Sequence, residues 1–140
     1  MADFHDTLFD LKGKNAIVTG ASRGIGEAIA HRLAQHGARV TVSSRDLEAC
    51  EKVATAINET EGRDAAHAVA CNISHEEHLQ KLVNKSQEIL GPTDILICNA
   101  AVNPAYGPSG EMTDEQIDKI FNCNIKSNHK LAHMAIPAME

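Results

Sequence analysis

A glycine-rich segment directly after an apolar run constrains this chain more than any other feature. The segment Thr19-Gly20-Ala21-Ser22-Arg23-Gly24-Ile25-Gly26 follows Ala16-Ile17-Val18 and opens an amphipathic helix. Its glycines let the backbone turn sharply and come close to a diphosphate, where a side chain would clash. The helix that follows directs its unpaired N–H groups and the positive end of its dipole at the same place. The order of strand, glycine turn and helix therefore predicts a nucleotide-phosphate site.

Composition narrows the class of protein. A chain of 140 residues predicts one domain, over residues 1–140, with a real core. Lys plus Arg total 13 against 19 for Asp plus Glu, and a net charge of −6 argues against a general nucleic-acid binder. No apolar run reaches membrane-spanning length, and Met1–Asp6 carries acids and no signal core. The cysteines are widely spaced, without a C-x-x-C pair, and predict reduced thiols in a cytoplasmic protein.

Hydrophobic periodicity predicts four strands that alternate with helices. The strands are expected at 15–18, 39–43, 65–70 and 94–98, and the first helix, at 24–36, carries Ile25, Ile29 and Leu33 on one face. Asp46 is expected to cap the second helix. Capping boxes are expected at the starts of the third and last helices, Ser74 with Glu77 and Thr113 with Gln116.

This alternation predicts an α/β fold, a three-layer Rossmann-type parallel sheet with helices on both faces and right-handed crossovers. Strand order 3-2-1-4 places the reversal of the strand order between the first and fourth strands. Ligands of such sheets bind at the carboxyl ends of the strands at that reversal. The turn at Gly20 and the segment at Asn99 occupy those two ends.

Three motifs together resemble the short-chain dehydrogenase/reductase family. The glycine segment matches the T-G-x-x-x-G-x-G motif, and Asn99-Ala100-Ala101 is similar to the N-A-G motif, with alanine in the last place. Asn124 looks like the active-site asparagine of that family in the next helix. The run Asn99–Pro104 looks closest to the carbonyl and retinol reductases of the family.

The resemblance implies hydride transfer between a nicotinamide cofactor and an alcohol or carbonyl substrate. It also implies four catalytic residues: a serine, a tyrosine, a lysine four residues later, and an asparagine. Only Asn124 matches one of them, because Tyr106 is followed at the fourth place by Gly110. We therefore interpret the chain as the cofactor-binding half of an NADP-dependent oxidoreductase, ending before the catalytic half and not expected to catalyse alone.

The end of the second strand predicts which cofactor binds. NAD-specific relatives place a carboxylate there for the ribose hydroxyls. This chain has Ser44 followed by Arg45, and a hydroxyl and a guanidinium suit a 2′-phosphate. Arg23 adds a second positive charge, so NADP is predicted in preference to NAD. The resemblance also implies Asn72 as the adenine contact, where an aspartate is more usual.

Each motif has a plainer interpretation. The glycines could form only a tight turn, Arg45 could be a solvated charge, and Asn124 could bond a backbone carbonyl within its helix. Tyr106 could contact substrate or merely anchor its loop. The pairs His129 with His133 and His75 with His78 have helical spacing but lack a third ligand, so no metal site is expected.

Three functions remain open from the sequence. The first is an oxidoreductase acting on a small alcohol or carbonyl, with no nucleic-acid or membrane partner. The second is a non-catalytic nucleotide-binding module, and the third is an interaction partner of a full-length relative. The sequence alone does not identify the substrate.

The strand predicted at 94–98 should form an exposed apolar edge, and such edges recruit other strands. We predict that the isolated chain of residues 1–140 is marginally stable and self-associates, through homo-oligomer contacts or this edge. Size-exclusion chromatography over a range of concentrations measures this. A clean monomer that resists heating would contradict the prediction.

Overall fold

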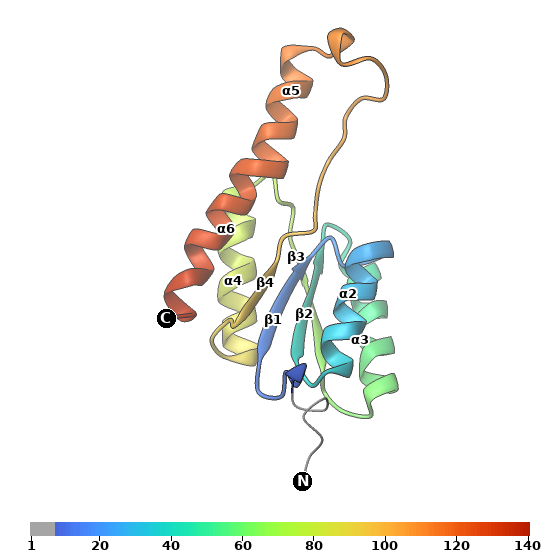
Figure 1. The fold of residues 1–140 in the computed structure, drawn as a ribbon, viewed down its shortest axis with the longest axis vertical. Helices are drawn as coiled ribbons and strands as arrows, with labels where there is room; N and C mark the ends of the chain where they lie inside the picture. The colour runs from blue at the N-terminus through green and yellow to red at the C-terminus, as the bar shows by residue number, and fades with distance from the viewer. Residues whose placement is uncertain (1–7) are drawn as a thin grey trace.

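The computed structural model describes residues 8–140, so the expectation for Met1–Asp6 lies outside the described residues. A parallel sheet is covered by helices on both faces (Figure 1), as predicted. In chain order the elements are β1 (Asn15–Thr19), α2 (Gly24–Gln35), β2 (Arg39–Ser44), α3 (Leu47–Glu61), β3 (Ala66–Ala70), α4 (Glu76–Leu90), β4 (Ile95–Ile97), η1 (Ser109–Glu111), α5 (Asp114–Phe121), η2 (Asn122–Lys126), α6 (Ser127–Ala135) and η3 (Ile136–Ala138). Among these described helices, none is long and apolar enough to cross a bilayer.

The sheet has the predicted strand order, β3-β2-β1-β4, with every pair parallel. Ile17 of β1 pairs with Thr41 on one side and with Leu96 of β4 on the other. The order in which strands are added reverses at β1, because β2 and β3 lie on one side of it and β4 lies on the other, so the carboxyl ends of β1 and β4 meet where a ligand crevice is expected. The topology therefore confirms the predicted fold.

Alternate residues of β1 enter two separate cores. Ala16 and Val18 belong to the core on the α2 and α3 side, and Ile17 belongs to the core on the α4 and α6 side. All three side chains are fully buried. Because successive side chains of a strand point to opposite faces, a short apolar run suits a strand that is covered on both sides.

Helix α2 packs through small residues rather than through its large apolar ones. Gly26, Ala30 and Ala34 are buried, whereas Ile25 is 75% exposed. Ile29 and Leu33 are partly buried at the margin of the core. The predicted apolar face therefore packs only in part. Helix α2 lies so close to the sheet that only small side chains fit between them.

The two predicted capping boxes have different outcomes. Thr113 and Gln116 bond reciprocally at the start of α5, as predicted. The predicted box of Ser74 with Glu77 is wrong, because α4 has His75 at its N-cap and no side-chain cap. The Ser74 hydroxyl instead lies 3.1 Å from the Cys123 thiol. A contact between distant segments has replaced the local cap.

Helices α5 and α6 form one continuous helix interrupted by the π-helical turn η2. The α5 end extends beyond the sheet (Figure 1). Ile117, Phe121 and Ile125 are 38, 57 and 55% exposed, whereas Leu131 is fully buried. The apolar spacing therefore predicted the helix correctly, but only its second half contributes to the core.

A polar cluster lies beneath α4. The Thr41 hydroxyl is 2.6 Å from the Ser86 hydroxyl and 3.1 Å from Nε2 of His67, while Nδ1 of His67 is buried without a partner. Burial, and to a smaller extent the nearby Arg39 guanidinium, lower the pKa of His67 from its usual 6.5. The folded protein therefore favours the neutral ring.

Because the pKa of His67 is lower in the folded chain than in the unfolded chain, its contribution to stability is present above about pH 6.5 and decreases as the pH falls through the lowered pKa. We predict that His67→Gln, which can still bond Thr41, reduces the loss of unfolding free energy between pH 7.5 and pH 5.5. Urea denaturation of the wild type and the variant at each pH measures the free energy of unfolding. Equal losses of unfolding free energy in the two proteins would show that His67 does not cause the pH dependence.

Candidate functional site

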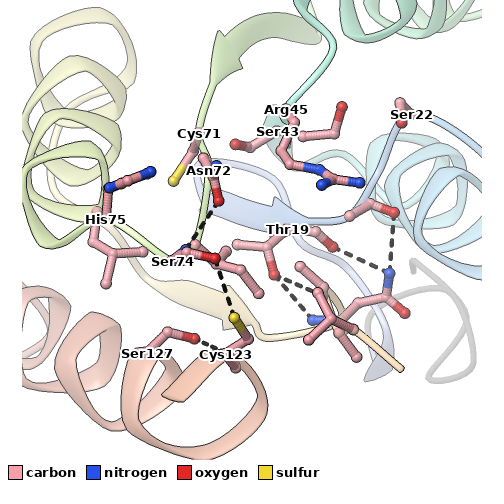
Figure 2. Close-up of a pocket in the computed structure, with 18 of the residues that line it drawn as sticks. Thr19, Ser22, Ser43, Arg45, Cys71, Asn72, Ser74, His75, Cys123 and Ser127 are labelled. Atoms are coloured by element: carbon pink, nitrogen blue, oxygen red, sulfur yellow. Dashed lines mark hydrogen bonds between the residues drawn. The ribbon is translucent and has the colours of Figure 1, made fainter. Parts of the chain in front are cut away.

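A cleft of about 1820 Å³ opens at the carboxyl ends of the strands (Figure 2). Its walls come from the ends of all four strands and from the α5–α6 helix. Most of the predicted site residues line it: Gly20, Ser22, Arg23, Gly24, Ile25, Ser44, Arg45, Asn72, Asn99, Ala100 and Ala101. Gly26 and Asn124 do not line the cleft: Gly26 packs against the glycine turn, and Asn124 bonds the loop after β4.

The glycine turn brings β1 and α2 into very close contact. A Cβ atom at Gly26 would lie 2.2 Å from the Gly20 carbonyl oxygen and 2.6 Å from Nδ2 of Asn99. Gly20 has a φ of +63°, and a Cβ atom there would lie 2.9 Å from the Cα atom of Ala100. Arg23 at the N-cap makes no side-chain cap bond, so the first N–H groups of α2 stay available to the cleft. A helix start of this kind suits a phosphate.

Thr19 and Asn99 join the ends of β1 and β4. The Thr19 hydroxyl accepts hydrogen bonds from the backbone N–H groups of Asn99, at 3.1 Å, and Ala100, at 3.0 Å. The Asn99 amide nitrogen donates to the carbonyl oxygens of Thr19 and Gly20, each at 3.1 Å. Asn99 therefore lines the cleft and at the same time fixes the shape of the glycine turn.

The end of β2 carries a hydroxyl pair and an arginine. Ser44 is engaged locally, because its hydroxyl accepts from the backbone N–H of Asp46 at 3.1 Å and from the Cys50 thiol at 3.1 Å. Asp46 caps α3, as predicted, by accepting from the Ala49 N–H. Arg45 is exposed, and Figure 2 shows its side chain pointing toward the side of the cleft where Ser22 lies. Within residues 8–140 it forms no ion pair with an acid.

The end of β3 forms a compact polar turn. The Asn72 amide oxygen accepts from the Ser74 N–H at 3.0 Å, and the Asn72 backbone N–H donates to Nδ1 of His78 at 3.3 Å. Next to it, burial raises the pKa of the Cys71 thiol to about 11. That thiol therefore stays protonated at neutral pH, and Asn72 is the polar group presented at this end of the cleft.

Asn124 lies in the π-helical turn and clamps the loop after β4. Its amide oxygen accepts from the Val102 N–H at 2.8 Å, and its amide nitrogen donates to the Val102 carbonyl at 2.9 Å. The side chains of Ser127 and Asn128 donate to the backbone carbonyls of Cys123 and Asn124, respectively. Asn124 therefore holds the loop that borders the cleft.

Sequence reasoning did not single out three other residues of the site. Thr19 belongs to the quoted motif, but its role as a shared acceptor becomes visible only when β1 and β4 are adjacent. Ser43 lines the cleft, is 1% exposed and has a hydroxyl without a partner among the described residues. Lys130 reaches across from α6 to bond Glu76, which lowers the pKa of that carboxyl. No local pattern marks Ser43 or Lys130.

The family model described as short chain dehydrogenase matches residues 14–140. The chain belongs to the short-chain dehydrogenase family. Dehydrogenase/reductase SDR family member 4 of Oryctolagus cuniculus is 39% identical over 93% of this chain and 49% of the relative. Short-chain dehydrogenase/reductase SDRA of Arabidopsis thaliana is 38% identical over 93% and 50%. The chain spans about half the length of these curated relatives.

Solved structures of other proteins share the fold. A metagenomic short-chain oxidoreductase in complex with NADP has a TM-score of 0.83 and 36% identity, over 92% of this chain and 57% of that one. L-Sorbose reductase from Gluconobacter frateurii, complexed with NADPH and L-sorbose, has a TM-score of 0.86 and 27% identity, over 94% and 49%. The family and the fold predicted from sequence are therefore confirmed.

The close contact at Gly26 leads to a prediction. Gly26→Ala should destabilise the chain by about 3 kcal/mol, because the added methyl group meets backbone and the core must shift. Gly110→Ala is the matched control, since a Cβ there meets nothing within 4 Å. Chemical denaturation of both variants measures the difference. Equal stability of the two variants would contradict the packing role of Gly26.

Proposed function

We propose that the cleft binds NADP(H) and that the chain serves an oxidoreductase acting on a small alcohol or carbonyl compound. When bound, the nicotinamide would supply or accept the hydride. The observation that carries the proposal is the glycine turn at the uncapped start of α2, with Ser44 and Arg45 at the end of β2 opposite; the nearby carboxylate of Asp46 is engaged in capping α3. The family membership supports the reaction class.

The cleft fits a dinucleotide in two independent respects. A Cβ added at Gly24 would meet nothing within 4 Å, so the space over the helix start is open where a diphosphate would lie. The buried hydroxyl of Ser43 has no partner among residues 8–140, and a buried polar group of this kind is normally bonded. A ligand group in the cleft would satisfy it.

We assign the remaining contacts residue by residue. The N–H groups at Ser22, Gly24 and Ile25 would bind the diphosphate. Arg45 and Arg23 would bind the 2′-phosphate, with Ser44 contributing a hydroxyl that is already shared with Asp46. Asn72 would present its free amide nitrogen to the adenine, because its oxygen already accepts from Ser74. Asn99, Ala100 and Ala101 would border the nicotinamide half.

Asn124 is proposed as the catalytic asparagine by its place in the family motif. Its side chain bonds both backbone groups of Val102, and we propose that any contribution to proton transfer comes through the backbone of the π-helical turn. Tyr106, the chain's one tyrosine, is 92% exposed. The sequence contains no Y-x-x-x-K segment, and we propose that residues 1–140 form one cofactor-binding domain that does not catalyse alone.

Two further proposals concern the setting of the chain. The half-buried edge strand β4 and the exposed face of Ile117, Phe121 and Ile125 support self-association. The cysteines are all free, and three are buried, which supports a reducing compartment such as the cytoplasm. A small-molecule substrate fits the family, and the net charge of −6 gives no support for a nucleic-acid partner.

Arg45→Ala tests the cofactor assignment. We predict that wild type binds NADPH more tightly than NADH, and that the substitution weakens NADPH binding by about tenfold or more, because charge-assisted hydrogen bonds to the 2′-phosphate are lost. NADH binding should change little. Titration followed by nucleotide fluorescence measures both dissociation constants.

Arg32→Ala is the matched control, since Arg32 is an exposed arginine of α2 that does not line the cleft. It removes the same charge and should leave the NADPH to NADH ratio unchanged. Equal binding of the two nucleotides by wild type, or an unchanged ratio in Arg45→Ala, would reject the NADP preference. No binding of either nucleotide would reject the proposed function itself.

A further inference from the structure

The Ser44 hydroxyl at the end of β2 has three hydrogen-bond partners. It accepts from the backbone N–H of Asp46 at 3.1 Å and from the Cys50 thiol at 3.1 Å, and it donates to the Asp46 carbonyl oxygen at 3.2 Å. A hydroxyl has one proton to donate and two lone pairs that accept. Both lone pairs of Ser44 are therefore occupied, and its proton is the one group that it can offer to a ligand.

The Cys50 thiol is held in place by the core. Cys50 lies in the first turn of α3 and is fully buried in the core on the α2 and α3 side. Burial raises the pKa of its thiol, so the S–H proton is present at neutral pH and can be donated. Because the side chain is enclosed, the direction of this donor follows from the packing of α3.

The Ser44 proton can leave the Asp46 carbonyl at small cost. That carbonyl oxygen also accepts the backbone N–H of Cys50 at 3.1 Å, so it keeps a partner when the Ser44 proton turns away. A phosphate oxygen is a stronger acceptor than a carbonyl oxygen, because its charge strengthens the hydrogen bond. A phosphate at the end of β2 would therefore take the Ser44 proton and leave no backbone group unpaired.

A hydroxyl that can only donate discriminates between the two nucleotides. The oxygens of a 2′-phosphate are strong acceptors and match the Ser44 proton. The 2′-hydroxyl of NADH has a proton of its own that needs an acceptor, and both lone pairs of Ser44 are occupied. Without the Cys50 thiol, one of these lone pairs would be free to accept from that ribose hydroxyl. The thiol therefore favours a phosphate over a hydroxyl.

We propose that Cys50 is a positioning residue for nucleotide specificity, and that its thiol fixes the Ser44 hydroxyl as a donor toward a 2′-phosphate. This inference rests on the proposed function, since it concerns the same cleft. Arg45 supplies the positive charge at this subsite. Cys50 does not line the cleft, and it acts on the nucleotide only through Ser44.

The test measures the dissociation constants of NADPH and NADH by nucleotide fluorescence. We expect Cys50→Ala to lower the preference for NADPH over NADH by about twofold to fivefold, the effect of one weak hydrogen bond. Cys50→Ser keeps a donor and should retain the wild-type preference. In a Ser44→Ala chain, Cys50→Ala should not change the preference further. Val53→Ala is the matched control, because it also shortens a buried side chain of α3 that does not line the cleft, and it should leave the preference unchanged.

Infrared spectroscopy of the S–H stretch gives a second measure that does not require Cys50→Ala to fold. The chain has four thiols, and Ser44→Ala should shift one S–H band to higher frequency, because a thiol that donates a hydrogen bond vibrates at lower frequency. An unshifted spectrum, an unchanged preference in Cys50→Ala, or an equally lowered preference in Cys50→Ser or Val53→Ala overturns the inference. NADPH binding by wild type then still supports the proposed function. Absence of NADPH binding by wild type overturns the proposed function and the inference together.

Discussion

The contact between Thr19 and Asn99 is the constraint on which the rest of the site depends. It joins the ends of β1 and β4 through one hydroxyl that accepts two backbone N–H groups and one amide that donates to two carbonyls. The glycine turn is held against this amide with no space for a side chain at Gly26. The start of α2, and with it the direction of its free N–H groups, follows from that packing.

Sequence reasoning predicted most of the fold, because its signals are local. The parallel sheet follows from the alternation of strands and helices, and the outcome at Asp46 and Thr113 depends on bonds to residues three positions away. The glycine segment predicted the wall of the cleft for the same reason, since its motif defines strand, turn and helix together. The cofactor specificity of Ser44 and Arg45 stays a prediction.

The predictions that failed, and the site residues that were missed, depend on contacts between segments that are far apart in the sequence. Ser74 has the right spacing for a cap with Glu77, but its hydroxyl contacts Cys123, which is 49 residues away. Ile25 has the period of a packed face, but the narrow space beside the sheet accepts Gly26, Ala30 and Ala34 instead. Thr19 and Ser43 were missed because an acceptor or an orphan hydroxyl is defined only by its neighbours in space.

The π-helical turn has a consequence for insertions and deletions. It accommodates one residue more than an α-helical turn, and each residue of an α-helix corresponds to a rotation of about 100°. Deleting a single residue between Asn122 and Lys126 would restore regular α-helix there and swing α5 by roughly that angle about its axis relative to α6. The number of residues in the π-helical turn therefore sets the rotation of α5 relative to α6. With this rotation, Asn124 bonds Val102 while Leu131 remains in the core.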